Sequence, residues 1–397
     1  PLAAAEESPP KKIAAIVTAY YHNSHADVIV SRLLQGRNLD SAPPCPDLKL
    51  VSLYVDQFPE NDISRALAEK HGVSIYDSVQ GALTLGGEEL AVDGVLLIAE
   101  HGKYPESDTG SIEYPKRRLF NEMAAVFRAS GRAAPVFSDK HLSDNWTDAK
   151  WIYDTAAELK APLMAGSSLP VLWREPAARI ERGAEVEQIV AVSYHRLDTY
   201  GFHALEMVQT LVEQRGKGET GVASVVCLEG EAVWEAGERG EYDPKLLEAA
   251  MEKLPRRLQG KRSLREAVKN PVLFAIEYRD GLKANVLTLN GAVGEWAVAW
   301  RLADGAEHAT WFRTQEARPF GHFALLLDGV ESMMHTGRPA WPVERTLLTS
   351  GTLDALLQSR KRGGERLETP WLAIEYRSEW QWTQPPAPPE DRPITGQ

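Results

Sequence analysis

Short apolar runs alternate with amphipathic helical patterns over the first 165 residues, and this alternation constrains the fold more than any other feature of the chain. The runs predict strands at 13–18, 48–55, 73–76, 92–99, 134–137 and 162–165. The helical patterns lie at 26–36, 63–71, 114–130 and 146–159. Strands that alternate with helices in this way usually pair in parallel. We therefore expect a Rossmann-like, doubly wound parallel sheet in an α/β arrangement.

The pattern changes after residue 165 to a series of strands with fewer helices. Strands are predicted at 189–194, 222–228, 274–278, 284–289, 295–300, 310–312 and 371–376, and helices at 202–214, 243–254 and 345–362. This order predicts an α+β domain with a mainly antiparallel open sheet. The chain then divides into a flexible leader (1–11), the Rossmann-like domain (12–165), a substrate and oligomerisation domain (166–384) and a loose, proline-rich tail (385–397).

Composition excludes several classes of protein. The net charge of −12 disfavours nucleic acid and anionic membranes as partners. No apolar run reaches the length of a membrane span. Two cysteines, Cys45 and Cys227, exclude a disulfide framework and a cysteine-rich metal site. The first residue, Pro1, fits either a cytoplasmic protein or an exported one whose leader has been removed, and we keep both alternatives.

The turn after the first predicted strand contains no glycine. Residues 19–25 read Ala-Tyr-Tyr-His-Asn-Ser-His, with Tyr20 and His22 where a dinucleotide-binding domain carries a glycine-rich fingerprint. Glycines in that turn let the backbone approach a pyrophosphate. Asp56, at the end of the second predicted strand, occupies the position of an acid that bonds a ribose hydroxyl. We expect a nucleotide-fold protein whose cofactor site is altered or abandoned.

Nitrogen and oxygen ligands gather at the predicted strand ends and at the start of the helix at 202–214. They are His22, His25, Glu100, His101, Asp139, His141, His203 and Glu206. The carboxyl ends of parallel strands meet at one edge of a sheet, so several of these side chains can share a crevice. Imidazole and carboxylate suit zinc, manganese or iron. A metal site made by His25, His101, Asp139, His141, His203 and Glu206 is therefore one hypothesis.

Four stretches, in this order, are similar to motifs of the Gfo/Idh/MocA family of sugar and polyol oxidoreductases. The first two stretches are the strand at 50–56 with the helix at 64–73, and the strand at 92–99. The third is Val-Phe-Ser-Asp-Lys at 136–140, which stands where the family has its E-K-P motif. The fourth is Asp-Thr-Tyr-Gly-Phe-His-Ala-Leu-Glu at 198–206, which stands where the family has D-x-G-x-H-x-x-D. The resemblance spans about residues 12 to 375. The chain departs from it in the missing glycines, in His141 where the family has proline, and in inserted stretches at 38–47 and 106–113.

The resemblance implies roles for individual residues. Lys140 and His203 match the lysine and histidine that flank the substrate hydroxyl in the family, and we add His101 as a third catalytic candidate. Such a reaction needs a base for the hydroxyl proton and a cation for the developing oxyanion. The resemblance also implies NAD(P) beside Tyr20, His22 and Asp56, a small carbohydrate-like substrate, and a homo-oligomer that pairs through the second sheet.

Three hypotheses for function follow. The first is an enzyme of this type that acts on a sugar- or polyol-like hydroxyl or keto compound through Lys140 and His203. The second is a metal-dependent hydrolase or lyase on the same scaffold, without NAD. The third is a non-catalytic binding protein that kept the scaffold.

Overall fold

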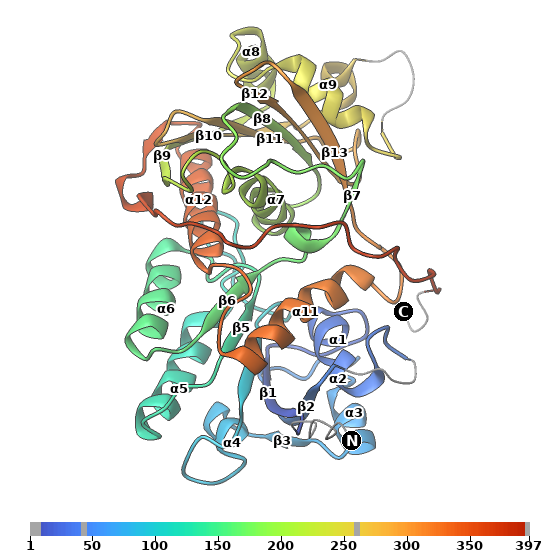
Figure 1. The fold of residues 1–397 in the computed structure, drawn as a ribbon, viewed down its shortest axis with the longest axis vertical. Helices are drawn as coiled ribbons and strands as arrows, with labels where there is room; N and C mark the ends of the chain where they lie inside the picture. Colours follow the sequence, from blue (N-terminus) through green and yellow to red (C-terminus); the bar gives the residue numbers. More distant parts are fainter. Residues whose placement is uncertain (1–8, 41–45, 258–262, 394–397) are drawn as a thin grey trace, which may run out of the picture.

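Two β-sheets lie one above the other in the molecule (Figure 1). The computed structural model describes residues 9–40, 46–257 and 263–393, so most of the predicted leader, Cys45 and the last four residues lie outside the described part. The first sheet has six strands, all paired in parallel, in the order β3–β2–β1–β4–β5–β6. These strands are β1 (Lys11–Val17), β2 (Leu48–Val55), β3 (Ser74–Tyr76), β4 (Gly94–Ile98), β5 (Val136–Asp139) and β6 (Leu163–Gly166).

Helices cover both faces of this sheet. They are α1 (His25–Val30), α2 (Arg32–Gln35), α3 (Ser64–His71), α4 (Val79–Thr84), α5 (Lys116–Ala129) and α6 (Trp146–Glu158). Helices α1 to α3 pack on one face, and α4 to α6 pack on the other. Every residue of β4 is buried, as expected of a strand between two helical layers. The helix predicted at 26–36 is broken at Ser31, whose hydroxyl bonds Tyr20 and Asp27.

The second sheet has eight strands in the order β14–β9–β10–β11–β8–β12–β13–β7. They are β7 (Trp173–Glu175), β8 (Val186–Ser193), β9 (Val222–Glu229), β10 (Val272–Tyr278), β11 (Lys283–Thr288), β12 (Trp296–Leu302), β13 (Glu307–Arg313) and β14 (Leu367–Glu368). Within the described strands of this second sheet, only β8 and β11 pair in parallel. Its other strand pairs are antiparallel. The predicted fold class, a Rossmann-like domain followed by a mainly antiparallel α+β domain, is confirmed.

Helices also cover both faces of the second sheet. Helices α7 (Phe202–Val212) and α12 (Glu344–Lys361) lie between this sheet and the first domain, whereas α8 (Glu231–Glu238) and α9 (Pro244–Glu252) lie on the far face (Figure 1). A single helical turn, α10 (Leu264–Ala267), follows. The far face is the surface through which the resemblance implied pairing. Because α8 and α9 bury part of it, that implication loses its physical basis here, and the oligomeric state stays a prediction.

Helix α11 (Gly321–Thr336) follows the strands of the second domain in the chain but packs in the first domain. Its buried side chains include Phe323, Leu326, Val330 and Met333, which join the same apolar cluster as β1, β2 and α1. Figure 1 shows α11 beside α1, in the lower half of the molecule. The first core is therefore built from two stretches of chain far apart in sequence.

The strand predicted at 371–376 is wrong. A short 3-10 turn, Pro370–Leu372, opens this segment, and the rest follows an irregular path. Within the segment, only Tyr376 makes a backbone bridge, to Glu219, so no continuous ladder forms. The alternating pattern arises because Leu372 and Tyr376 turn inward, Leu372 into the core and the Tyr376 hydroxyl toward Glu213.

The expectation of a loose tail is also wrong for residues 385–393. Trp173 Nε1 donates to Pro386 O at 2.5 Å, and Gln315 Nε2 donates to Pro389 O at 2.7 Å. The Arg392 backbone N–H donates to Arg318 O at 2.6 Å. In Figure 1 the red segment that leads into this tail crosses the molecule between the two sheets.

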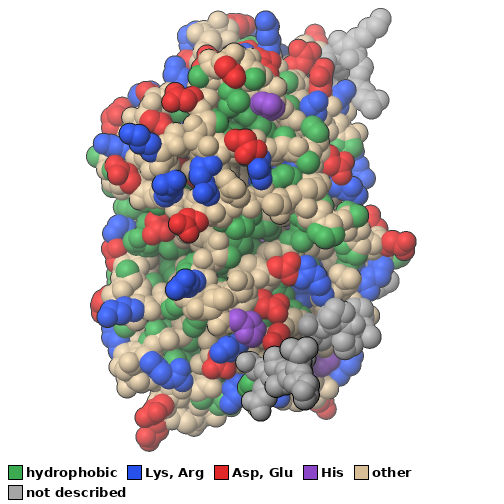
Figure 2. Space-filling model, in the orientation of Figure 1, with side chains coloured by type: hydrophobic (Ala, Val, Ile, Leu, Met, Phe, Trp, Pro, Cys, Tyr) green, Lys and Arg blue, Asp and Glu red, His purple; other side chains and the backbone are tan. Residues whose placement is uncertain are grey.

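Figure 2 shows acidic and basic side chains interspersed over one face of the molecule. Among the described residues, no helix combines the length and the apolar character that a membrane crossing needs.

Candidate active site

A cavity of about 520 Å³ lies at the carboxyl ends of β1, β4 and β5, where it meets the second domain. Five residues singled out from the sequence line it: His25, Glu100, His101, Lys140 and His203. They come from four separate segments of the chain, because Glu100 and His101 are neighbours. The sheet edge brings four of them together, and the first turn of α7 supplies His203. The prediction that Lys140 and His203 share one crevice is confirmed by this lining.

Glu100 is a buried carboxylate that holds two lysines. Its Oε2 lies 2.8 Å from Lys140 Nζ, and its Oε1 lies 3.1 Å from Lys116 Nζ. Although burial opposes ionisation, the two ammonium groups hold the pKa of Glu100 well below its usual range. The carboxylate in turn overcomes burial and raises the pKa of Lys140. Lys140 is therefore a cation that can donate to a ligand oxygen, and it is not poised as a base.

Lys116 fixes the loop that carries Lys140. Its buried ammonium group, at the start of α5, donates to Asp139 O at 2.8 Å and to His141 O at 2.7 Å, and it also bonds Lys140 O. Burial lowers the pKa of Lys116. Sequence reasoning missed this residue because a lysine in the first turn of a helix usually points to solvent.

His25, at the start of α1, is hydrogen-bonded to Asp139, at the end of β5. Its Nδ1 lies 2.6 Å from Asp139 Oδ2, and its ring packs edge-on against His101 and Phe323, with ring centroids 5.3 and 5.1 Å away. Asp139 is buried, and the His25 side chain is 17% exposed. The pair joins the start of α1 to the end of β5.

His101 and His203 complete the wall with nitrogens that have no protein partner. His101 Nε2 and His203 Nδ1 are both buried and without a hydrogen bond. Burial lowers the pKa of His101 to about 3 and that of His203 well below its usual range. Both imidazoles are therefore neutral near pH 7, and each can accept or donate one hydrogen bond to a bound molecule. Trp296 packs 5.7 Å from the His203 ring and also lines the cavity.

Three members of the predicted metal set, Asp139, His141 and Glu206, do not line the cavity. Glu206 bonds the Thr346 and Thr349 hydroxyls and the Ser167 N–H, so it joins α7 to α12. His141 packs against Phe202, and burial lowers its pKa to about 3. No group of three or more metal-binding side chains occurs within residues 9–40, 46–257 and 263–393. The metal hypothesis is therefore not supported.

The residues at the expected dinucleotide position do not fit the family's way of holding NAD(P). Asp56 already accepts from Tyr54 and Tyr104 hydroxyls at 2.7 Å each and from Arg118 at 2.5 Å. Neither Asp56, Tyr20 nor His22 lines the cavity. A ribose would have to displace the Tyr104 hydroxyl, which the loop after β4 brings onto the acid.

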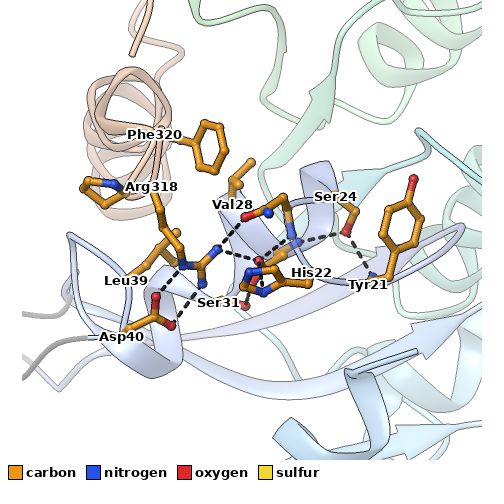
Figure 3. A network of polar contacts seen from close by, with 12 residues as sticks. Tyr21, His22, Ser24, Val28, Ser31, Leu39, Asp40, Arg318 and Phe320 are labelled. Carbon is orange, nitrogen blue, oxygen red and sulfur yellow. Dashed lines mark hydrogen bonds and ion pairs between the residues drawn. The ribbon is translucent and has the colours of Figure 1, made fainter. Parts of the chain in front are cut away.

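The turn after β1 is also closed by its own side chains (Figure 3). The N–H groups of Tyr21 and Asp27 donate to Ser24 Oγ, and the Asn23 N–H donates to Asp27 Oδ2 at 2.8 Å. Tyr20 is fully buried, with its hydroxyl 2.7 Å from that of Ser31. A pyrophosphate needs free N–H groups at this point, and here they donate to the Ser24 hydroxyl and the Asp27 carboxylate.

Arg318 locks this arrangement from the second half of the chain. The guanidinium donates to Asn23 Oδ1 and Asp27 Oδ2 at 2.9 Å each and also bonds Asp40 (Figure 3). Two carboxylates thus stand where a dinucleotide would bring its diphosphate, and the cation between them is already paired. No sequence signal identified Arg318, because its partners lie about 280 to 295 positions away.

Comparisons with known proteins support the fold. A scan of protein-family models and a search of curated proteins give no match. Among solved structures, a myo-inositol dehydrogenase from Lactobacillus casei, in complex with NAD(H) and myo-inositol, matches with a TM-score of 0.53 and 12% identity over 90% of this chain and 96% of that one. GenD2 of gentamicin A biosynthesis, in complex with NAD, matches with a TM-score of 0.56 and 14% identity over 93% and 99% of the two chains.

A biliverdin reductase from Synechocystis sp. PCC 6803, in complex with biliverdin and NADP⁺, matches with a TM-score of 0.51 and 15% identity over 88% of this chain and 99% of that one. These similarities cover nearly all of both chains, and they concern architecture because the identities are low. The protein therefore shares the fold of these dehydrogenases and reductases, a parallel Rossmann-like sheet followed by a mainly antiparallel sheet.

Proposed function

We propose that this protein is an enzyme that acts on a hydroxyl- or keto-bearing carbon of a sugar- or polyol-like substrate in the cavity at the ends of β1, β4 and β5. The observation that carries the proposal is the Lys140 ammonium group, which lines the cavity while Glu100 holds it charged. A fixed cation in a partly dry site stabilises negative charge that develops on a substrate oxygen.

The remaining lining suits a polyhydroxylated molecule. His203 and His101 offer neutral imidazole nitrogens without protein partners. Trp296 and Tyr200, whose rings stack 5.4 Å apart, supply an aromatic wall of the kind on which sugar rings pack. Trp296 also belongs to the buried core against the second sheet, so it packs the sheet and lines the cavity. His203 would bind and orient the hydroxyl next to the one that Lys140 holds.

Binding measurements test this proposal. We expect isothermal titration calorimetry to detect myo-inositol or its 2-ketone, and Lys140→Met to weaken that binding by about 10- to 100-fold, the value of one charge-assisted hydrogen bond. Lys150→Met is the matched control, because Lys150 pairs with Asp154 on the exposed face of α6. If Lys140→Met binds the ketone as the parent does, Lys140 is not the oxygen-binding group.

A nicotinamide-dependent oxidoreductase is the second candidate. The solved neighbours that are complexes with NAD, NAD(H) or NADP⁺ favour it, and the acid Asp56 is retained. The occupied Asp56 and the closed turn after β1 oppose it. Titration of the protein with NAD⁺ and NADP⁺, followed by tryptophan fluorescence, separates the two candidates. A dissociation constant (Kd) below about 100 μM would establish the oxidoreductase, and no binding at about 5 mM would exclude it.

A further inference from the structure

His25, the first residue of α1, has the features of a general base. We infer that His25, held by Asp139, moves a proton at a carbon next to a substrate carbonyl, and that this step needs no dinucleotide. The substrate class in this inference rests on the function proposed above. The proton transfer itself rests on a separate set of contacts.

The first of these contacts fixes the imidazole ring. Asp139 Oδ2 holds Nδ1 at 2.6 Å, which leaves Nε2 as the nitrogen available to the cavity. The neighbouring rings of His101 and Phe323 prevent the imidazole from turning. A buried carboxylate on one nitrogen orients a histidine and stabilises the imidazolium that forms when the other nitrogen takes a proton.

The second feature is the neighbour of Asp139 in the chain. Lys140 follows Asp139 directly in the chain. Asp139 therefore holds the base His25, and the next residue, Lys140, supplies the cation. Lys116 ties the carbonyls of both residues to one ammonium group, and Glu100 holds both lysines. The loop after β5 thus orients the base through Asp139 and carries the cation as Lys140.

These two groups suffice for a balanced reaction without an oxidant. His25 Nε2 takes the proton from the carbon next to the carbonyl. The electron pair of the broken C–H bond forms a C=C bond, and the carbonyl π pair moves onto oxygen, where Lys140 stabilises the enolate. Return of a proton from the His25 imidazolium to the same carbon exchanges its hydrogen with solvent, and return to the oxygen gives the enol, with no net change in oxidation state of the substrate and enzyme together.

Hydrogen exchange in D₂O tests the inference directly. The wild-type protein, stripped of nucleotides on charcoal, is mixed with the 2-ketone of myo-inositol, and the loss of the proton signals next to the carbonyl is followed by ¹H NMR. We expect faster exchange than in buffer, unchanged by added NAD⁺. We expect His25→Gln to slow it by about 100-fold or more, within the range for loss of a general base.

Two further variants separate a catalytic role of His25 from a structural one. His25→Ala should regain exchange with added imidazole, because the side chain is partly open to solvent. Asp139→Asn should slow exchange about 10- to 100-fold and shift its pH profile, as expected of a positioning residue. His335→Gln is the matched control: this histidine lies 3.8 Å from Asp47 on the surface and outside the cavity.

The outcomes distinguish this inference from the proposed function. If the ketone binds in a Lys140-dependent way but the wild type does not speed exchange, the inference is overturned and the binding function stands. Full exchange by His25→Ala without imidazole would also overturn it. If the ketone does not bind at all, the proposed substrate class fails, and the inference fails with it.

Discussion

Glu100 is the residue on which the charge balance of the cavity depends. It is the carboxylate that both Lys116 and Lys140 contact, and all three side chains are buried. A buried charge is tolerated only when its partners are present. The position of Glu100 at the end of β4 was predicted from the sequence, because a continuous apolar strand must end where the polar residues begin. Its two lysine partners were not predictable as a set, since they lie on different elements.

We expect Glu100→Gln to destabilise the protein by about 3–5 kcal/mol, because it leaves two buried ammonium groups without a carboxylate. Urea denaturation monitored by circular dichroism measures the free energy of unfolding. Glu122→Gln is the control, since Glu122 makes only an exposed pair with Arg118. Equal stability of the two variants would show that Glu100 is not the required counter-charge.

The buried histidines predict a pH dependence of stability. In the folded protein the pKa values of His141 and His322 are about 3, because burial disfavours the charged rings. The unfolded chain has an ordinary histidine pKa near 6.5 and so binds more protons below that pH. The free energy of unfolding should therefore fall as the pH drops from about 6.5 toward 3, by up to about 1.4 kcal/mol per pH unit for each histidine.

Thermal and urea unfolding between pH 7.5 and 5 checks this dependence before the carboxylates titrate. His141→Gln should make the free energy of unfolding depend less steeply on pH, because one buried histidine no longer contributes. The exposed His335→Gln variant should leave the slope as it is. A steeper slope in His141→Gln than in the parent would contradict the assigned burial effect.

Helices α7 and α12 are joined by a buried ion pair. Arg345 Nε lies 2.9 Å from Glu213 Oε2, both side chains are fully buried, and the Tyr376 hydroxyl donates to the same carboxylate. We expect Arg345→Met to cost about 3–5 kcal/mol, because it leaves the Glu213 carboxylate unpaired. Adding Glu213→Leu to that variant should restore part of the loss. A double-mutant cycle with strictly additive costs would show that the two groups do not interact.

Elements buried on both faces were the easiest to predict. The sequence predicted the positions of these elements to within two residues at each end for α5, α6 and α12, and it also predicted the apolar strands β1 and β4. Helix α11 was missed although Phe323, Leu326, Leu327 and Val330 follow a helical spacing, because a single strand-rich domain was expected there. The segment at 371–376 alternates like a strand because Leu372 and Tyr376 face inward, but only Tyr376 makes a backbone bridge, to Glu219.

The part of the candidate site that lies at the carboxyl edge of the first sheet could be predicted from the sequence. Strand ends gave His25, His101 and Lys140, since parallel strands end at one edge. The pairing of His25 with Asp139 depends on the path of a turn without glycine, and the lock by Arg318 depends on a contact across most of the chain. Such contacts leave no periodic pattern in a single sequence.

For the whole molecule, we expect residues 12–165 to fail to fold alone. The face of the first sheet that α11 covers would expose the apolar surface that Leu326, Leu327 and Met333 bury. The fragment should show no cooperative thermal transition by calorimetry. A fusion of the fragment to residues 318–341 through a Gly/Ser linker should regain one, and a cooperative transition in the fragment without it would contradict the prediction.

The return of α11 to the first core also affects how the protein is made. Domains that consist of one continuous stretch can fold as the ribosome releases them. Here the first core lacks one wall until residue 336 has left the exit tunnel, by which time the strands of the second sheet up to β13 are already present. Newly made chains therefore hold an unfinished amino-terminal half during most of translation, and both halves gain their final stability nearly together.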